Sequence, residues 1–212
     1  FDQSKLSESE SLSLQLFMAD LKRKAANDAF PHHSYIMHQF RAWHTTVPSF
    51  LINIHRVSDE SDALAYISRL EKVAPLFDQV IDQLRVRETL GIFPPKWSYE
   101  QMIQSSANVL KGQPFVEGES ESTILADFSA KVNALEIDDA AKNKLLEEAN
   151  KALLSALQPA YIKLIAELEK HRDISPEGDG VWRLPNGSEW YQNRLNWFTT
   201  TELNAQEVHD LG

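Results

Sequence analysis

Histidine is the residue type in this sequence best suited to metal chemistry. The chain contains seven histidines: His32, His33, His38, His44, His55, His171 and His209. A zinc site on one helix typically uses two histidines four residues apart with a glutamate beside the first, because this spacing directs both imidazoles at one ion. Here His33 and His38 are five apart, His38 and His44 are six apart, and no histidine is followed by glutamate. We therefore expect polar or half-buried helix histidines, and we predict no metal ligand and no catalytic residue in this chain.

Paired carboxylates are a second possible source of chemistry. Asp138–Asp139 and Glu147–Glu148 are adjacent pairs. Neighbouring residues on a helix diverge by about 100°, so the two members of a pair do not converge on one substrate atom. The sequence also lacks a Gly-x-Ser-x-Gly motif and a glycine-rich phosphate loop. Solvated helix faces are the favoured interpretation of these acids.

A concentration of aromatic residues near the end of the chain is more suggestive. It comprises Trp182, Trp190, Tyr191, Trp197 and Phe198. The favoured interpretation is that they pack this segment onto the rest of the fold, since indoles bury a large area per residue. The alternative is a wall that faces a substrate, where aromatic rings and hydroxyl groups would offer contacts. The candidate substrate-binding residues are then Trp182, Tyr191, Thr199 and Thr200.

Composition limits the classes of protein to which the chain can belong. Its 212 residues suit one sizeable domain or two small ones, and 42% apolar with 25% charged residues is typical of a folded protein. The net charge of −10 disfavours binding to nucleic acid and to an anionic membrane surface. The absence of cysteine excludes disulfides, thiolate nucleophiles and cysteine zinc sites. No apolar run approaches the roughly 18 residues of a membrane span.

Apolar residues at three- and four-residue steps predict helices along most of the chain. The expected helices cover approximately 10–28, 35–54 with an interruption at Pro48, 58–90, 98–110, 123–135 and 138–170. Ser58 is the expected cap of the third helix, and Gly91 its stop. Pro75 should kink or split that helix, and Pro159 should bend the last one.

The hydrophobic period changes after this helical region. Residues 175–180 are rich in turn formers, 181–184 are a candidate strand, and Asn186–Gly187 is a tight-turn signal. The predicted fold class is therefore all-α, an irregular bundle of about 6–8 helices with a short β-hairpin-like element near the C-terminus.

The chain ends just as another helix begins. Asn204 and Glu207 form a capping-box pattern, and Val208 and Leu211 then start an apolar stripe that stops at Gly212. A helix of about eight residues is marginal without a tertiary partner or more chain. We therefore expect the front part of a longer protein. Its expected parts are a flexible lead-in over 1–12, a helical bundle over 13–170, and a hairpin and helix segment over 171–212 that leads into a missing C-terminal catalytic part.

The motifs of this last segment resemble those of a bacterial family of unknown function, DUF885. Members commonly show G-x-x-x-L-P-x-G-x-x-Y-Y followed by T-T-x-L and E-[IV]-H-x-L-G. The matching stretches here are 180–187, 190–191, 199–203 and 207–212. Weaker landmarks at 91–95 and 159–161 extend the likeness over most of the chain. Trp190 replaces the usual tyrosine, and Asn204–Ala205 replaces a common Thr-Pro helix start; neither change threatens the resemblance.

The resemblance implies a large, mainly helical protein, often an exported lipoprotein, that is similar to zinc metallopeptidases. The family's H-E-x-x-x-G-H-H-like metal motif lies downstream of the T-T-x-L segment. No zinc ligand or general base can therefore be assigned to a residue here, and zinc is implied only for the full-length protein. This chain would be inactive alone and would form a helical wall of the cleft, with the hairpin and threonine segment nearest a peptide substrate.

The resemblance also implies a location in the periplasm or at the outer membrane of a Gram-negative bacterium. Contact with the membrane would then come only through a lipid anchor outside this chain. The alternative hypothesis is a self-sufficient helical module that binds a ligand or a protein through its tryptophan-rich segment and a groove between helices.

Overall fold

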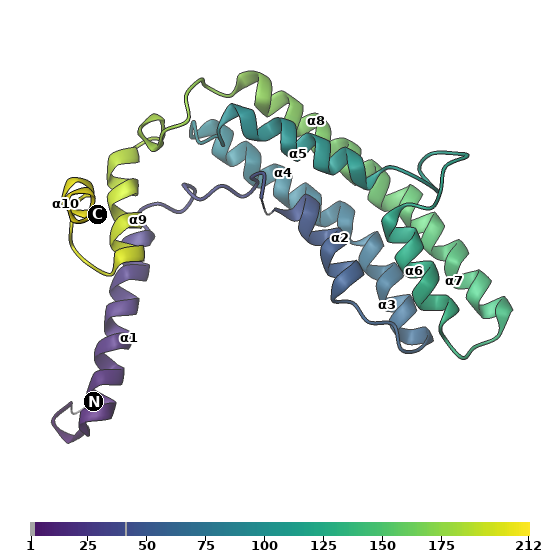
Figure 1. Ribbon diagram of the computed structural model, residues 1–212, viewed down its shortest axis with the longest axis horizontal. Coiled ribbons are helices and arrows are strands. Elements are labelled where there is room, and N and C mark those ends of the chain that lie inside the picture. The colour runs from purple at the N-terminus through teal and green to yellow at the C-terminus, as the bar shows by residue number, and fades with distance from the viewer. Residues whose placement is uncertain (1–2, 41) are drawn as a thin grey trace. The chain divides into compact units, whose positions relative to one another are not determined.

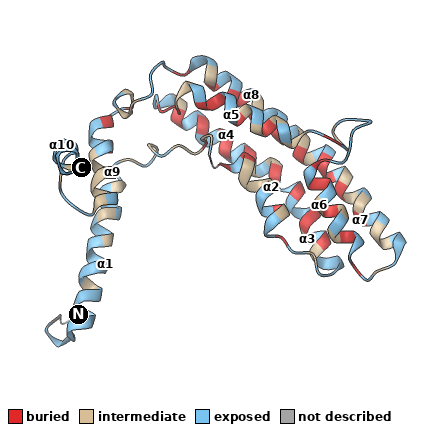
Figure 2. Cartoon of the chain, viewed as in Figure 1, coloured by how far each residue is buried: buried red, intermediate tan, exposed pale blue. Residues whose placement is uncertain are grey.

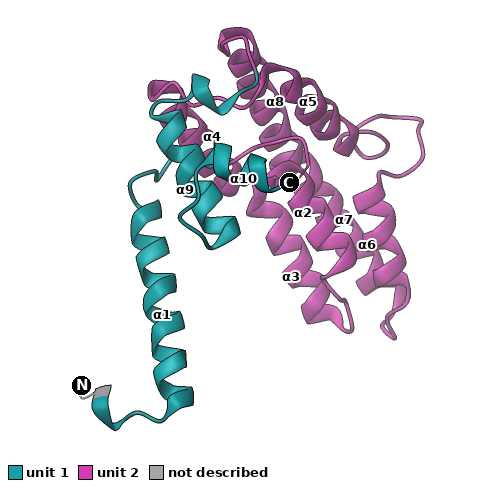
Figure 3. Ribbon diagram, turned by 60° about the vertical axis from the view of Figure 1, so that its left-hand side comes forward, with its two compact units in different colours: residues 1–34, 179–212 teal, residues 35–178 magenta. Residues whose placement is uncertain are grey.

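The computed structural model describes residues 3–40 and 42–212, and every regular element in these ranges is helical (Figure 1). The predicted all-α class is therefore confirmed. Residues 1 and 2 of the expected lead-in lie outside the described residues. The chain divides into two compact units, one made of residues 1–34 and 179–212 and the other of residues 35–178 (Figure 3).

The larger unit begins with four helices. They are α2 (Trp43–Asn53), α3 (Glu60–Glu71), α4 (Val73–Thr89) and α5 (Lys96–Val109). The predicted split near Pro75 is present, because α3 ends at Glu71 and Pro75 falls in the first turn of α4, where a missing N–H is harmless. Asp59, rather than the expected Ser58, caps α3 by accepting a 2.9 Å hydrogen bond from the Asp62 N–H.

The second half of this unit contains α6 (Thr123–Asn133), α7 (Asp139–Ala152) and α8 (Gln158–Ile174). A π-helical segment, η2 (Leu153–Leu157), joins α7 to α8 where a bend was predicted. Pro159 has no N–H to donate to the carbonyl of Ser155, so the ladder is interrupted there, and the Gln158 N–H bonds the Leu153 carbonyl instead.

Proline also explains a buried link between α2 and α8. Pro48 lies inside α2 and cannot donate to the carbonyl of His44, four residues earlier. That carbonyl instead accepts a 2.8 Å hydrogen bond from the hydroxyl of Tyr161 on α8. The sequence pattern predicted a helix from about 35, whereas the structure has turns and bends before α2 begins at Trp43.

The main core lies within the larger unit, as the concentration of buried residues in Figure 2 shows. Its largest fully buried side chains are Tyr66, Tyr99, Tyr161, Phe77 and Phe128. Rings from α4 and α8 pack edge to face, with the centroids of Phe77 and Tyr161 4.9 Å apart. These contacts fix the register of α4 against α8, the two helices that carry the polar cluster described below.

The smaller unit contains α1 (Glu8–Asn27), α9 (Gly187–Thr199) and α10 (Ala205–Leu211), with the short 3₁₀ segments η1 (Gln3–Lys5) and η3 (Val181–Arg183). α1 begins with a capping box between Ser7 and Glu10, and none of its residues is buried. The capping box predicted for Asn204 and Glu207 is confirmed at the start of α10.

The predicted β-hairpin is wrong. Residues 181–183 form the 3₁₀ turn η3, in which the Leu184 N–H donates to the Val181 carbonyl at 3.0 Å. Asn186 then adopts a left-handed conformation with φ of 49° and precedes α9 directly. A side chain at Gly187 would lie 2.0 Å from the Val181 carbonyl oxygen, so this glycine permits the chain to fold back tightly. The predicted tight turn at Asn186–Gly187 is present, but the chain continues from it into α9 and not into a strand.

No helix in the described ranges combines the length and apolar character needed to cross a membrane.

Candidate functional site

The predicted substrate-binding residues are spread over the turn before α9 and along α9 itself. Trp182 lies on η3 with 78% of its surface exposed, and Tyr191 lies on α9 with 46% exposed. Thr199 donates its hydroxyl hydrogen to the Leu195 carbonyl at 2.9 Å, and Thr200 is the left-handed C-cap of α9. Both aromatic rings are therefore available for contact with another molecule, while the Thr199 hydroxyl is engaged within its own helix.

The aromatic ring that packs this unit is Trp190. It is 8% exposed, and its ring centroid lies 5.4 Å from those of Phe30 and His33. The His33 Nε2 atom lies 2.7 Å from the Pro185 carbonyl oxygen. The favoured packing interpretation thus applies to Trp190.

Arg194 organises the outer aromatic rings of α9. Its guanidinium carbon lies 5.1 Å from the Trp190 ring centroid, 5.0 Å from Trp197 and 5.2 Å from Phe198. Its Nη1 donates to the Asn27 side chain of α1 at 2.9 Å. The guanidinium therefore makes cation–π contacts within α9 and links α9 to α1 through its hydrogen bond to Asn27.

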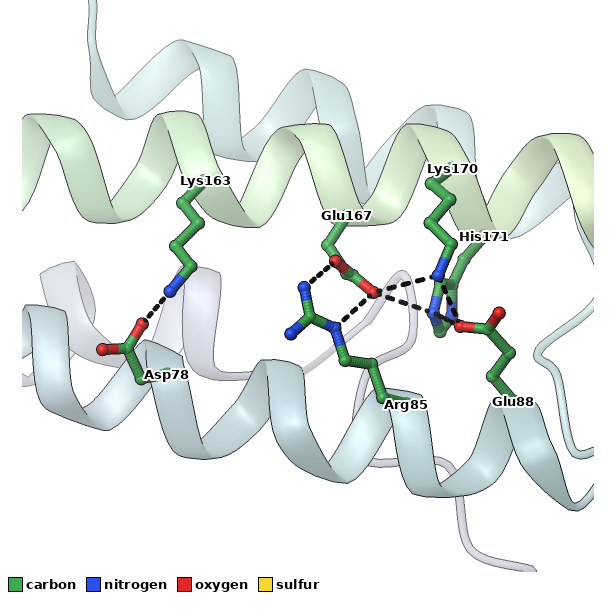
Figure 4. A network of polar contacts seen from close by, with 7 residues as sticks. All are labelled: Asp78, Arg85, Glu88, Lys163, Glu167, Lys170 and His171. Carbon is green, nitrogen blue, oxygen red and sulfur yellow. Dashed lines mark hydrogen bonds and ion pairs between the residues drawn. The ribbon is translucent and has the colours of Figure 1, made fainter.

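The most chemically concentrated group of side chains in the described residues joins α4 to α8. This group, the α4–α8 ion cluster, consists of Arg85, Glu88, Glu167, Lys170 and His171 (Figure 4). Arg85 Nε and Nη2 donate to the two oxygens of Glu167 at 3.1 and 2.8 Å. Lys170 Nζ donates to Glu88 Oε2 at 2.8 Å. His171 Nε2 faces both carboxylates, 3.1 Å from Glu88 Oε2 and 3.3 Å from Glu167 Oε1.

Helix geometry brings these residues together. Glu167 and His171 lie one turn apart on α8, and Arg85 and Glu88 lie three residues apart on α4, so each pair occupies one helix face. His171 and Glu167 are buried, whereas Lys170 extends from the edge with about half of its side chain exposed. A second, fully peripheral pair joins the same helices, with Lys163 Nζ 2.6 Å from Asp78 Oδ1.

The pKa values in this cluster follow from its geometry. The hydrogen bond from Arg85 lowers the pKa of Glu167, and the hydrogen bond from Lys170 lowers the pKa of Glu88. Burial lowers the pKa of His171 from its ordinary value, against the opposing effect of the two carboxylates. At neutral pH the two carboxylates are thus balanced by one guanidinium and one ammonium, with a neutral imidazole between them.

This charge balance does not suit a zinc ion. Glu88, Glu167 and His171 have three potential ligand atoms within 4.8 Å of one another. However, both oxygens of Glu167 already accept hydrogen bonds from Arg85, and Lys170 occupies the Glu88 oxygen that faces His171. A divalent ion would add two positive charges to a cluster that is already neutral, or would displace Lys170. The group fits an ion-paired fastening between α4 and α8 and does not fit a zinc centre.

Another histidine, His44, is also removed from solvent. It is fully buried on α2, and neither ring nitrogen has a hydrogen-bond partner among the described residues. Burial lowers its pKa to about 4, with a smaller contribution from His38. His44 is therefore a neutral core residue above that pH.

Comparison with known families decides the relationship of this chain to other proteins. A family model described as bacterial protein of unknown function, DUF885, matches residues 1–212. The chain belongs to the DUF885 family. No curated protein matches it.

The fold of this DUF885 chain is similar to a crystal structure described as "the putative lipoprotein from Colwellia psychrerythraea". The TM-score is 0.76 with 20% sequence identity, and the similarity covers 84% of the present chain. The chain spans only 30% of the length of that protein. At this identity the likeness establishes the shared fold.

Sequence reasoning missed the α4–α8 ion cluster of this DUF885 chain. Half of the signal was available, because Glu167 and His171 are four residues apart on one predicted helix. The other half was not, since Arg85 lies 82 residues from Glu167 in the sequence. The sequence criterion considered pairs of histidines and glutamates that follow a histidine. Glu167 precedes His171 by four residues and so did not meet it.

Proposed function

We propose that this chain is the non-catalytic helical portion of an exported, zinc-dependent, peptidase-like protein, in which it forms one wall of the substrate cleft. The observation that carries the proposal is the α4–α8 ion cluster. The side chains that most resemble a catalytic set are paired with each other and fasten two helices, which is a structural use of charge.

Membership of DUF885 and the likeness to a longer protein support the rest of the proposal. The neighbour is described as a putative lipoprotein, and the match covers only 30% of its length. A catalytic zinc would be held by the H-E-x-x-x-G-H-H-like motif of a longer polypeptide and would polarise a peptide carbonyl or activate water there. The contribution of the present residues would be to shape the cleft and to exclude water from it.

The exposed aromatic residues of the smaller unit are the proposed contact points with a peptide. Trp182 and Tyr191 present large rings to solvent, and such rings supply contact area at low entropic cost. By analogy with its lipoprotein neighbour, the protein would be exported to the periplasm or held at the outer membrane by a lipid anchor outside this chain.

A comparison of peptide hydrolysis tests this proposal. The 212-residue chain should not hydrolyse a mixed peptide library, whereas a longer DUF885 protein that contains it should. Replacement of Trp182 and Tyr191 by alanine in the longer protein should raise KM more than it lowers kcat. Trp97→Ala is the matched control, since Trp97 is an exposed tryptophan of α5 in the other unit. Hydrolysis by the 212-residue chain itself would overturn the proposal.

A second candidate function is a self-sufficient helical binding module. The exposure of Trp182 and Tyr191 favours it equally. It predicts tight binding of a peptide or protein by the isolated chain, lost on replacement of both residues by alanine. If neither replacement altered any interaction, this second candidate would fail.

A further inference from the structure

An apolar pocket in the larger unit lies apart from every residue discussed as a site above. It has a volume of about 350 Å³, within the range typical of small-molecule sites. Its walls come from α2 and from the junction of α3 with α4. The lining residues are Trp43, Thr46, Val47, Phe50, Leu51, Arg69, Lys72, Val73 and Leu76.

The pocket has a buried apolar base and partly exposed aromatic sides. Leu51 and Val73 are each 2% exposed, whereas Trp43 is 39% exposed and Phe50 41% exposed. The two rings thus keep much of their apolar surface in water, although they adjoin the core. An apolar ligand that covered them would gain roughly 25 cal/mol for each Å² removed from water.

Two cations lie among these apolar side chains. Arg69 is near the end of α3, and Lys72 is the single residue between α3 and α4, so both cations come from this junction. Arg69 Nη1 lies 3.2 Å from His55 Nδ1 and donates to the Ala65 carbonyl at 3.3 Å, while its guanidinium lies over the Phe50 ring at 5.9 Å.

Neither cation has an acidic partner among the residues that the structure describes. Within residues 3–40 and 42–212, no carboxylate forms an ion pair with Arg69 or with Lys72. Carboxylates are nevertheless abundant in this chain, which has 31 acidic and 21 basic residues. An apolar pocket whose charged lining residues are both cationic is complementary to a molecule with an apolar tail and an anionic head.

We propose that this pocket binds an amphiphile with one carboxylate head and an apolar tail of medium length. The tail lies against Trp43, Phe50 and Leu76, and the carboxylate accepts hydrogen bonds from Lys72 and Arg69. The proposal does not depend on the peptidase-like function, because every lining residue belongs to the larger unit, whereas Trp182 and Tyr191 belong to the other.

Isothermal titration calorimetry of the 212-residue chain with three eight-carbon ligands tests the proposal. Octanoate, 1-octanol and octylammonium have the same tail and differ in head charge. We expect octanoate to bind most tightly, 1-octanol more weakly and octylammonium most weakly. Equal affinity for the three, or no octanoate binding, would overturn the proposal; the pocket would then be an apolar surface suited to another polypeptide.

Substitutions in the pocket separate the contributions of the carboxylate head and of the apolar tail to binding. Lys72→Glu should weaken the binding of octanoate by about tenfold or more, since a charge-assisted hydrogen bond contributes roughly 1.5–3 kcal/mol. It should leave the affinity for 1-octanol unchanged. Lys111→Glu makes the same charge change at an exposed residue outside the pocket and should alter neither affinity. Trp43→Ala should weaken the binding of all three ligands. Unchanged octanoate affinity in Lys72→Glu would contradict the proposal, and this exposed residue can be replaced without disturbing the core.

Discussion

Glu167 on α8 accepts two hydrogen bonds from the Arg85 guanidinium on α4, at 3.1 and 2.8 Å, and lies beside the buried imidazole of His171. The Glu167 side chain is 8% exposed, whereas the Arg85 side chain is 52% exposed, so only the carboxylate is buried. This relationship joins two helices whose contact also includes the Phe77–Tyr161 ring pair. Residues of types that often serve in catalysis therefore stabilise the contact between α4 and α8.

Glu167→Gln should destabilise the chain by about 2 kcal/mol, because a neutral amide replaces the acceptor of a bidentate, charge-assisted contact. Urea unfolding at pH 7 measures this change. Asp78→Asn is the matched control, since Asp78 pairs with Lys163 across the same two helices with both side chains more than half exposed. The control should cost less than about 1 kcal/mol. Equal losses in the two variants would contradict a larger contribution from the pair that contains the buried Glu167 carboxylate.

The same cluster predicts a loss of stability in acid. Arg85 lowers the pKa of Glu167 in the folded chain, and Lys170 lowers that of Glu88. A carboxyl with a depressed folded pKa contributes stability that is complete above its unfolded pKa of about 4.5 and is lost as the pH falls through the folded value. The urea concentration at the unfolding midpoint of the native chain should therefore decrease as the pH is lowered below about 4.5. In Glu167→Gln this decrease with pH should be less steep. Parallel curves would argue against the assignment.

His44 should make a separate contribution at higher pH. Its pKa is about 4 in the folded chain, against an ordinary value of 6.5 for a solvated histidine. A histidine with a depressed folded pKa favours folding fully above its unfolded pKa, and this advantage is lost as the pH falls from about 6.5 to about 4. The difference corresponds to roughly 3 kcal/mol. His44→Leu should flatten the pH dependence of the unfolding free energy between these limits; an unchanged slope would show that His44 is not buried and neutral.

Tyr161→Phe tests the proline-linked contact between α2 and α8. The Tyr161 hydroxyl satisfies the His44 carbonyl, which Pro48 leaves without its helical partner, at 2.8 Å. Loss of this hydroxyl should cost about 1–3 kcal/mol, because a buried carbonyl becomes unsatisfied. Tyr66→Phe is the control, since its hydroxyl lies 3.4 Å from Asp127 and that hydrogen bond is weak. Thermal unfolding should show the larger drop in Tm for Tyr161→Phe.

The sequence predicted the helices well because their signals are local. Apolar spacing located α3 to α8 closely, and the Asn204–Glu207 pattern identified the cap of α10. The strand prediction at 181–184 failed because apolar content over a few residues does not distinguish a strand from a 3₁₀ turn, and the close approach of Gly187 to Val181 decided the outcome. The α4–α8 ion cluster and the apolar pocket depend on contacts between helices, which no local pattern encodes.

The zinc content of the purified chain shows whether the side chains of the α4–α8 ion cluster hold a metal ion. Under the proposed function this chain is non-catalytic: Glu88, Glu167 and His171 belong to the α4–α8 ion cluster, and His44 belongs to the core. After exposure to zinc and exhaustive dialysis, the 212-residue chain should retain far less than one zinc per molecule, as should its Glu88→Gln variant, whereas a longer DUF885 protein that contains it should retain about one. Stoichiometric zinc in the 212-residue chain, lost in Glu88→Gln, would show that the α4–α8 ion cluster is a metal centre and would contradict the account.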